Sequence, residues 1–487
     1  MLLRRSLAVL LLALISLALS AKDEAKDKPP KKQYKILVYS SKFGHSHCNF
    51  VGNIADVLVE AGHDVTTLLP EVNEQMADGT TKSKKIHMYK EMMGSQMDFF
   101  ETSNYDVVAA IMQGRFFGNL FVATCKTTIN TPGLMEKLRD EHYDVLITET
   151  FDLCGAGIAD FVKPKSLIVL STSVLVAHQH DEIGVMQSLS HNPSLFTTKL
   201  DVHSMVDRFW NLFAEGLLRI QFGSVRPMTD VVLKERFGKD YPNIMKITGN
   251  SAYVFTNGEP LIGFAAPTLS KVIDIAGIGA KEPKALDKYE EPEDDFGKNK
   301  AAALENLVLT KWMPQNDLLN HSKVVAFISH GGMGSVQETA RRGTPAIFLP
   351  LFGDQPRNAY MMEQNGLGKM LDKRHISNAP VIIATLKEVL EDKSFTKRCQ
   401  RMSRMLARKP FNAKELLVKH VEFAAEFGPS ASLRPESLDM NIIELYNLDI
   451  IAILLVICIA VTAISLYAVK LAVSRIFKLG APKQKTS

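Results

Sequence analysis

The sequence predicts an α/β protein with two lobes built on parallel sheets, followed by a C-terminal transmembrane helix. In the N-terminal half, apolar β-branched runs typical of buried strands alternate with helical segments. The same alternation returns between residues 324 and 352. The third observation is an uncharged apolar stretch over residues 450–469, which is long enough at helical rise to cross a bilayer. At 487 residues, the chain has room for two domains of ordinary size plus extensions.

The chain begins with the pattern of a secretory signal. Arg4 and Arg5 precede a short apolar run and then small residues, so we expect cleavage after Ser20. A retained anchor is the alternative, which the shortness of the apolar run disfavours. A charged, proline-containing spacer follows over residues 22–35. We therefore expect a signal peptide at 1–20, an N-terminal lobe at 21–260, a C-terminal lobe at 261–440, a transmembrane helix at 450–469 and a tail at 470–487.

The N-terminal lobe opens with a strand–helix–strand unit. Strands are expected over residues 34–40 and 63–69, with a helix over residues 50–62 between them, and this unit predicts a parallel sheet. The turn that precedes the helix contains His47. Histidine suits the role of a base because its ordinary pKa lies near neutrality.

Glu149 lies near the end of another buried strand, over residues 143–151. An alternative role for it is that of a carboxylate stabilised by a helix N-terminus. Between residues 151 and 250, a mostly helical region is rich in methionine and aromatic residues. This region could line an apolar cavity for a substrate, or it could be plain core.

A strand–turn–helix unit in the C-terminal half is typical of phosphate sites. The apolar strand over residues 324–329 stops at His330, and the glycines that follow allow a sharp turn and a close approach of a ligand. The next helix, over residues 335–342, directs its first N–H groups and its positive dipole end toward this turn. A diphosphate would be stabilised there.

Three acidic or amide side chains lie close to this turn in the expected fold. Glu338 follows Gly334 by one helical turn and can face the same crevice. Asp354 and Gln355 come just after a second apolar strand, at its carboxyl end, where ligands bind in open α/β sheets.

Together these residues closely resemble the signature of the UDP-glycosyltransferase family, whose membrane-bound animal members include the UDP-glucuronosyltransferases. The resemblance implies the GT-B fold, in which two Rossmann-like lobes face each other across a cleft. It also implies the donor-binding roles of these residues: Trp312 stacks on uracil, Gln315 holds the uridine, Glu338 holds the ribose hydroxyls, Asp354 and Gln355 hold the sugar, and His330, Gly332, Gly334 and Ser335 bind the diphosphate.

On the acceptor side, the resemblance implies that His47 is the catalytic base. Glu149 stands where the family has the aspartate that pairs with this histidine, so the side chain is one methylene longer. The implied reaction transfers glucuronic acid or glucose from the UDP-sugar, a co-substrate, to a small lipophilic acceptor, with inversion at the anomeric carbon. It requires no cofactor and no metal, and the five cysteines show no CxxC or Cys/His spacing that would hold one.

The departure from the family that matters most is a gap in the sequence. The chain runs from Asp287 directly into Lys288, so the first strand–helix–strand unit of the donor-binding lobe is missing. In a sheet of order 3-2-1-4-5-6 the lost strand is central, and its absence exposes sheet edges on both sides. Skipped coding sequence or an error in its assembly explains such a clean gap. The alternative to an enzyme is therefore a non-catalytic membrane-anchored partner, or an inactive splice-like form.

The C-terminal end predicts a location in the endoplasmic reticulum membrane. Basic residues follow the apolar stretch, which places the tail in the cytosol and both lobes in the lumen, as in a single-pass type I protein. The last five residues, with Lys483 and Lys485, resemble the dilysine signal that returns such proteins to the endoplasmic reticulum. The net charge of +4 is too small to indicate nucleic-acid binding. Association with itself or with relatives stays open.

The first prediction concerns this tail. Replacing both lysines, Lys483→Ser with Lys485→Ser, should let the protein leave the endoplasmic reticulum, because a retrieval receptor would no longer bind the tail. Fluorescence microscopy of the tagged protein checks this, with the single change Lys478→Ser as the control. An unaltered distribution of the double variant would place the retention signal elsewhere.

Overall fold

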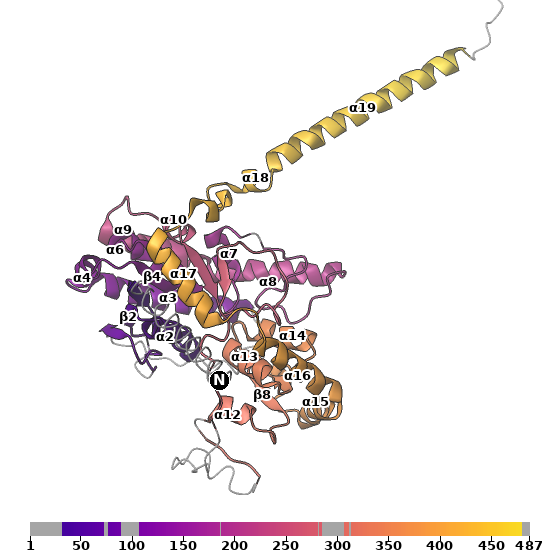
Figure 1. Ribbon diagram of the computed structural model, residues 1–487. Coiled ribbons are helices and arrows are strands. Elements are labelled where there is room, and N and C mark those ends of the chain that lie inside the picture. Colours follow the sequence, from indigo (N-terminus) through magenta and orange to yellow (C-terminus); the bar gives the residue numbers. More distant parts are fainter. Residues whose placement is uncertain are drawn as a thin grey trace, which may run out of the picture. The chain divides into compact units, whose positions relative to one another are not determined.

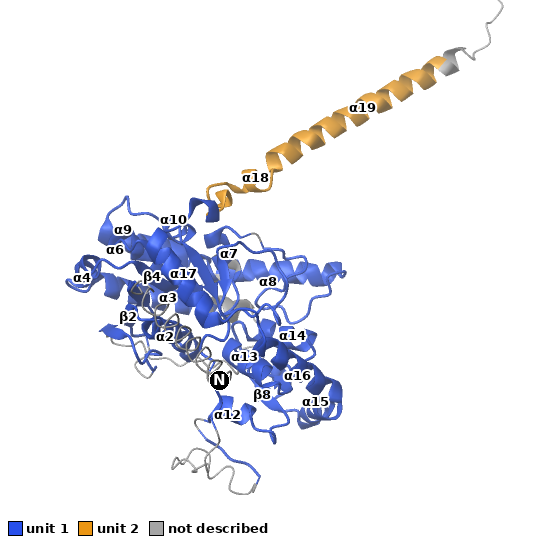
Figure 2. Cartoon of the chain, viewed as in Figure 1, with its two compact units in different colours: residues 1–433 blue, residues 434–487 orange. Residues whose placement is uncertain are grey.

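A computed structural model describes residues 32–72, 76–88, 107–185, 187–280, 282–284, 306–310 and 313–479 (Figure 1). The chain forms two compact units, residues 1–433 and residues 434–487 (Figure 2). Four sequence predictions fall outside the described residues: the signal peptide, the junction of Asp287 with Lys288, Trp312 and the end of the tail with its two lysines.

Within the described residues, the larger sheet has seven parallel strands in the order β3-β2-β1-β4-β5-β6-β7. Its central strands are buried on both faces, as expected for a parallel sheet that helices cover. The sheet extends beyond residue 260, the predicted lobe boundary, because β7 pairs with β6. The strands are β1 (Lys35–Tyr39), β2 (Asp64–Pro70), β3 (Lys84–Met88), β4 (Val145–Glu149), β5 (Ser166–Ser171), β6 (Tyr253–Thr256) and β7 (Val272–Asp274).

Helices cover both faces of this sheet. Alternate residues of β1 point to opposite sides, so Leu37 and Tyr39 join one apolar cluster and Ile36 and Val38 join the other. The first cluster packs under α3 (Val107–Asn130), α4 (Leu134–Asp140), α5 (Cys154–Gly157), α6 (Ala159–Val162), α7 (Ala177–Ile183), α9 (Val225–Phe237) and α10 (Ile244–Gly249). The second lies under α2 (His45–Glu60) and α17 (Ala413–Phe427). Helix α8 (Met205–Gly223) packs against α3, α7 and α9.

Helix α17 comes from the C-terminal part of the chain and returns to the larger sheet (Figure 1). Leu417, Val421 and Ala424 are completely buried in the same cluster as β1 and β4. Burial of this apolar stripe stabilises the contact between the C-terminal helix of the first unit and its N-terminal sheet. The N-terminal lobe is therefore completed by a helix that lies more than a hundred residues beyond its last strand.

The smaller sheet has three parallel strands in the order β10-β9-β8, in the part of the chain that the structure describes. Apolar side chains of α13, α14 and α16 pack on it. Its elements, with the helices around it, are α12 (Gln315–Leu319), β8 (Phe327–Ser329), α13 (Met333–Arg342), β9 (Ala346–Phe348), α14 (Gln355–Gln364), β10 (Gly368–Met370), the 3₁₀ turn η1 (Lys373–His375), α15 (Ala379–Glu391) and α16 (Lys393–Ala407).

Strand β8 forms an open edge of this sheet. Ile328 is 55% exposed, whereas Ile347, its register partner on β9, is 1% exposed. The apolar residues Leu307, Val308 and Leu309 are also exposed, and no strand is assigned to the described residues between β7 and β8. This arrangement is expected when the first strand–helix–strand unit is missing, because the first strand of that unit would pair with β8 and cover it.

A disulfide joins Cys125 on α3 to Cys154 at the start of α5. Cys48, Cys399 and Cys458 are free. The bond fastens α3 to the segment that follows β4, so it holds one helical wall of the N-terminal lobe against the end of a central strand. Disulfides of this kind persist in oxidising compartments such as the lumen of the endoplasmic reticulum.

The second unit carries the apolar helix α19 (Leu448–Leu479). Residues Leu448–Arg475 are long and apolar enough to cross a membrane, a longer stretch than the predicted 450–469. Asn441 caps the short helix that precedes α19 by accepting bonds from the N–H groups of Ile443 and Glu444. The remaining short elements are the 3₁₀ turn η2 (Ala431–Leu433) in the first unit, and η3 (Glu436–Leu438) and α18 (Ile442–Leu445) in the second.

Candidate active site

His47 lies in the first turn of α2, directly after β1. The turn between β1 and α2 is therefore shorter than the sequence predicted, because the helix begins at His45 rather than at residue 50. The imidazole Nδ1 lies 2.6 Å from Oε1 of Glu149, the last residue of β4. Strands β1 and β4 are neighbours, so the two side chains meet at the carboxyl edge of the sheet. The longer arm of glutamate is accommodated without loss of the hydrogen bond.

Thr172 is a third member of this cluster that the sequence analysis missed. Its hydroxyl donates to Oε1 of Glu149 at 2.8 Å and lies 3.0 Å from Nδ1 of His47. Thr172 follows β5, the neighbour of β4, so all three side chains come from consecutive strand ends. The one sequence signal was a polar residue immediately after a buried strand.

Two opposing effects act on the pKa of His47. Burial of the ring lowers the pKa, but the charge of Glu149, its hydrogen bond and the more distant Asp354 raise it, and the net shift is upward from 6.5. Because Nδ1 is held by Glu149, Nε2 is the ring nitrogen that remains for a substrate proton. The ring centroids of Phe43 and Phe151 lie 4.3 and 5.6 Å from that of the imidazole, which gives His47 an apolar surrounding on this side.

The turn after β8 has the geometry that its glycines predict. Gly331 has a φ of 84°, which favours glycine, and a Cβ on Gly332 would lie 2.5 Å from Nε2 of His330. Gly332 is the N-cap of α13, and no side chain among the described residues caps this helix. The first backbone N–H groups of α13 therefore remain available to an anion. Burial lowers the pKa of His330, with partial opposition from Asp354, so the ring is neutral near pH 7.

Three of the residues that are predicted to bind the UDP-sugar lie in contact near the start of α13. The amide nitrogen of Gln315 donates to Oε2 of Glu338 at 2.7 Å and to the hydroxyl of Ser335 at 3.2 Å. Gly334 lies in the same first turn, where a Cβ would meet no atom within 4 Å. This site thus places a carboxylate, an amide and a hydroxyl beside a free helix N-terminus.

Asp354 and Gln355 behave differently from each other. Oδ2 of Asp354 accepts bonds from the hydroxyl of Ser173 at 2.7 Å and from the amide of Asn358 at 2.8 Å. Gln355 is buried, and its side-chain oxygen accepts hydrogen bonds from the N–H groups of Leu351 and Phe352. The side-chain amide nitrogen therefore remains for a ligand. The hydrogen bond from Ser173 to Asp354 connects the two lobes. The sequence analysis predicted neither Ser173 nor Asn358 as a site residue.

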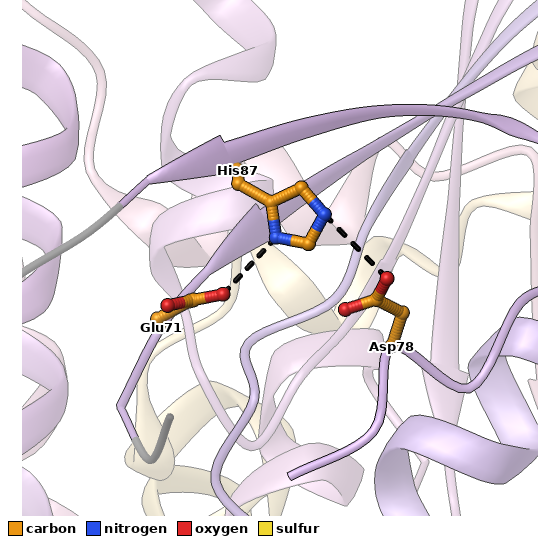
Figure 3. Close-up of side chains that lie close together, drawn as sticks. All are labelled: Glu71, Asp78 and His87. Carbon is orange, nitrogen blue, oxygen red and sulfur yellow. Dashed lines mark hydrogen bonds and ion pairs between the residues drawn. The ribbon is translucent and has the colours of Figure 1, made fainter. Parts of the chain in front are cut away.

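Glu71, Asp78 and His87 form a separate cluster in which one potential metal-ligand atom of each residue lies within 4.8 Å of the others (Figure 3). The Nζ atom of Lys42 lies 2.9 Å from Glu71 and 3.1 Å from Asp78, and Lys85 also contacts Asp78. Since lysine ammonium groups already bind both carboxylates, the cluster is an ion-pair network, and we assign it no metal.

Two α/β lobes whose strand ends carry a His–carboxylate pair and a free helix N-terminus define a glycosyltransferase of the GT-B class. Solved structures with this fold are similar to the chain. The glycotransferase of kitacinnamycin aligns with a TM-score of 0.52 and 14% identity, covering 82% of this chain and 99% of that one. Phytolacca americana UGT2, complexed with UDP-2fluoro-glucose and pterostilbene, aligns with a TM-score of 0.51 and 14% identity, covering 80% and 100%. These likenesses confirm the predicted fold.

The chain belongs to the UDP-glucoronosyl and UDP-glucosyl transferase family, whose model matches residues 34–298 and 290–483. The chain is 26% identical to the putative UDP-glucuronosyltransferase ugt-47 of Caenorhabditis briggsae, over 86% of this chain and 89% of that protein. It is 27% identical to human UDP-glucuronosyltransferase 1A10, over 86% and 88%. The protein is thus a UDP-glycosyltransferase of the animal type. The two family matches meet at residues 290–298, beside the junction where the sequence analysis places the missing unit.

The second prediction tests Glu338 in a form of the chain that carries the family's strand–helix–strand unit inserted after Asp287, called here the completed form. Glu338→Ala should weaken UDP binding by about 1.5–3 kcal/mol, since a carboxylate bonded to ribose hydroxyls would be lost. Calorimetry measures this, with the surface change Glu388→Ala as the matched control. If the Glu338 variant and the completed form bind UDP with equal affinity, Glu338 does not contact UDP.

Proposed function

We propose that this site transfers glucuronic acid or glucose from the UDP-sugar to a hydroxyl group of a small lipophilic acceptor, with inversion at the anomeric carbon. The observation that carries the proposal is the 2.6 Å contact between Nδ1 of His47 and Glu149. A histidine held in this way has one nitrogen fixed and the other available, which is the arrangement of a general base. The proposed reaction uses no cofactor and no metal.

On the acceptor side, Nε2 of His47 would take the hydroxyl proton while the oxygen attacks the anomeric carbon. Glu149 then stabilises the imidazolium that forms, and the upward shift in the pKa of His47 supports this role. Thr172 donates to the same carboxylate oxygen and so restricts its position. A single displacement of this kind inverts the anomeric centre.

On the donor side, negative charge grows on UDP as it leaves. The uncapped N-terminus of α13, with Gly332, Gly334 and Ser335, would stabilise that charge through backbone N–H groups. A neutral His330 would donate a hydrogen bond to the diphosphate. Gln315 would hold the uridine, and Glu338, which it contacts, would hold the ribose hydroxyls. Asp354 with the amide nitrogen of Gln355 would hold the sugar hydroxyls, since an acceptor-only carboxylate suits hydroxyl donors.

The same proposal places the protein in the endoplasmic reticulum membrane with both lobes in the lumen. Helix α19 supports a membrane anchor. The disulfide between Cys125 and Cys154 supports an oxidising compartment for the first unit.

The second candidate function is that of a non-catalytic membrane protein that associates with full-length relatives. The exposed edge of β8 and the exposed apolar residues 307–309 favour it, because an open strand edge pairs readily with another chain. Thermal stabilisation of the purified protein by UDP distinguishes the two candidates. A rise in Tm with UDP supports the enzyme, and a folded sample without such a rise supports the partner.

The third prediction compares the two forms directly. The 487-residue chain should show little or no glycosyl transfer, because loss of a central strand removes ladder hydrogen bonds and opens the core of the C-terminal lobe. The completed form should be active with UDP-glucose or UDP-glucuronic acid, and its His47→Ala variant should lose on the order of 10²–10⁴ in turnover while keeping its UDP affinity. Comparable turnover of the two forms would show that the remaining strands suffice.

A further inference from the structure

The sequence contains a single acceptor motif for N-linked glycosylation, Asn320-His321-Ser322, which the proposed function does not use. The motif begins directly after α12 and lies in the connection from α12 to β8, where all three residues are exposed. Asn192 and Ser194 have the same spacing, but the proline between them prevents glycosylation and Asn192 is buried. An accessible acceptor motif thus occurs once in the chain.

The side chain of Asn320 has no structural role that would explain it. The residue ends α12 with φ −82° and ψ −12°, so this position does not need the tolerance of asparagine for left-handed backbone. Its backbone N–H donates to the oxygen of Asp317 at 3.2 Å, as any residue other than proline could. Neither its side-chain amide nor the hydroxyl of Ser322 makes a hydrogen bond within the described residues. Both groups that the modification requires are therefore free.

Asn320 lies at the end of α12 opposite to the residues proposed to bind the donor. Gln315, the first residue of the helix, bonds Glu338 and Ser335 on α13. Asn320 follows five positions later, about 7.5 Å further along the helix axis. The hydroxyl of Thr344 donates to the oxygen of Leu319 at 3.1 Å and holds this far end in place. A glycan on Asn320 would therefore leave the donor site open.

The same position lies next to the open edge of the smaller sheet. The N–H of Val324 donates to the oxygen of His321 at 2.9 Å and closes a turn, after which the chain enters β8. Val325 is 65% exposed and Ile328 is 55% exposed. Even a fully extended chain would place Val325 within about 17 Å of Asn320. A glycan is bulky and hydrophilic, whereas an open apolar edge pairs readily with another chain.

We infer that Asn320 carries an N-linked glycan, which covers the open edge of β8 and limits its pairing with another chain. The donor is a lipid pyrophosphate oligosaccharide in the lumen of the endoplasmic reticulum. The amide nitrogen of Asn320 attacks the anomeric carbon of that oligosaccharide, a C–N bond forms, the bond from carbon to the pyrophosphate oxygen breaks, and the amide loses a proton. This inference rests on the lumenal location in the proposed function, and the glycan would oppose the association that the second candidate function requires.

Expression of the full chain in animal cells tests the modification. Treatment with an N-glycosidase should increase the mobility of the wild type on a denaturing gel and convert Asn320 to aspartate, which peptide mass spectrometry identifies. Asn320→Gln and Ser322→Ala should each abolish the shift, whereas Ser322→Thr, which keeps the hydroxyl, should retain it. Asn306→Gln is the matched control, because Asn306 is an exposed asparagine outside any acceptor motif, and it should leave the shift intact.

A second acceptor motif separates failure of this inference from failure of the lumenal location. Ser430→Asn creates Asn-Ala-Ser in an exposed loop after α17, and it is introduced together with Asn320→Gln. If the wild type is unmodified but this double variant is glycosylated, the lobes are lumenal and the inference is overturned. If neither protein is glycosylated, the lumenal location itself is wrong.

Size-exclusion chromatography in detergent tests the covering of the edge. Asn320→Gln and Ser322→Ala should elute as larger assemblies than the wild type, because the edge of β8 would be free to pair. Ser322→Thr and Asn306→Gln should elute with the wild type. If loss of the glycan leaves the elution of both variants unchanged, the glycan does not cover the edge, and that part of the inference is overturned.

Discussion

The neighbouring positions of β1, β4 and β5 are the constraint on which the site depends. Parallel strands end at the same edge of a sheet, so residues at or just after the ends of these three strands come within hydrogen-bond distance although they are far apart in sequence. His47, Glu149 and Thr172 meet in this way. The strands are fixed by two apolar clusters, one on each face, and a slip of a single residue would turn their buried side chains to the wrong faces.

The two sheets differ in how completely they are built. The larger sheet is covered on both faces and is closed by α17, a helix from the far end of the unit. The smaller sheet keeps the glycine turn after β8 and helix α13, but β8 lies at an open edge among the strands that the structure describes. Ser173 still bonds Asp354 across the lobes. The larger sheet is thus fully covered and the smaller one is incomplete, so the acceptor binding and the sugar transfer that we propose can be tested separately.

Local sequence patterns predicted most of the fold, because strand runs, glycine turns and helix starts are encoded in neighbouring residues. The roles of the candidate site residues came from the resemblance to the UDP-glycosyltransferase family. Glu149 and Asp354 could be found as acids at strand ends. Thr172 and Ser173 could not, since their roles depend on the order of strands in the sheet, which no local pattern specifies. The return of α17 and the pairing of β7 were missed for the same reason.

The pKa of His47 tests most directly whether Glu149 prepares this histidine for catalysis. Carbethoxylation by diethylpyrocarbonate requires a neutral imidazole, so its rate at His47 against pH, read by mass spectrometry, gives the pKa without any turnover. We expect a midpoint above 6.5 in the wild type, because Glu149 and Asp354 outweigh the burial of the ring, and a downward shift in Glu149→Gln. A midpoint at or below 6.5 that Glu149→Gln leaves unchanged would contradict the account.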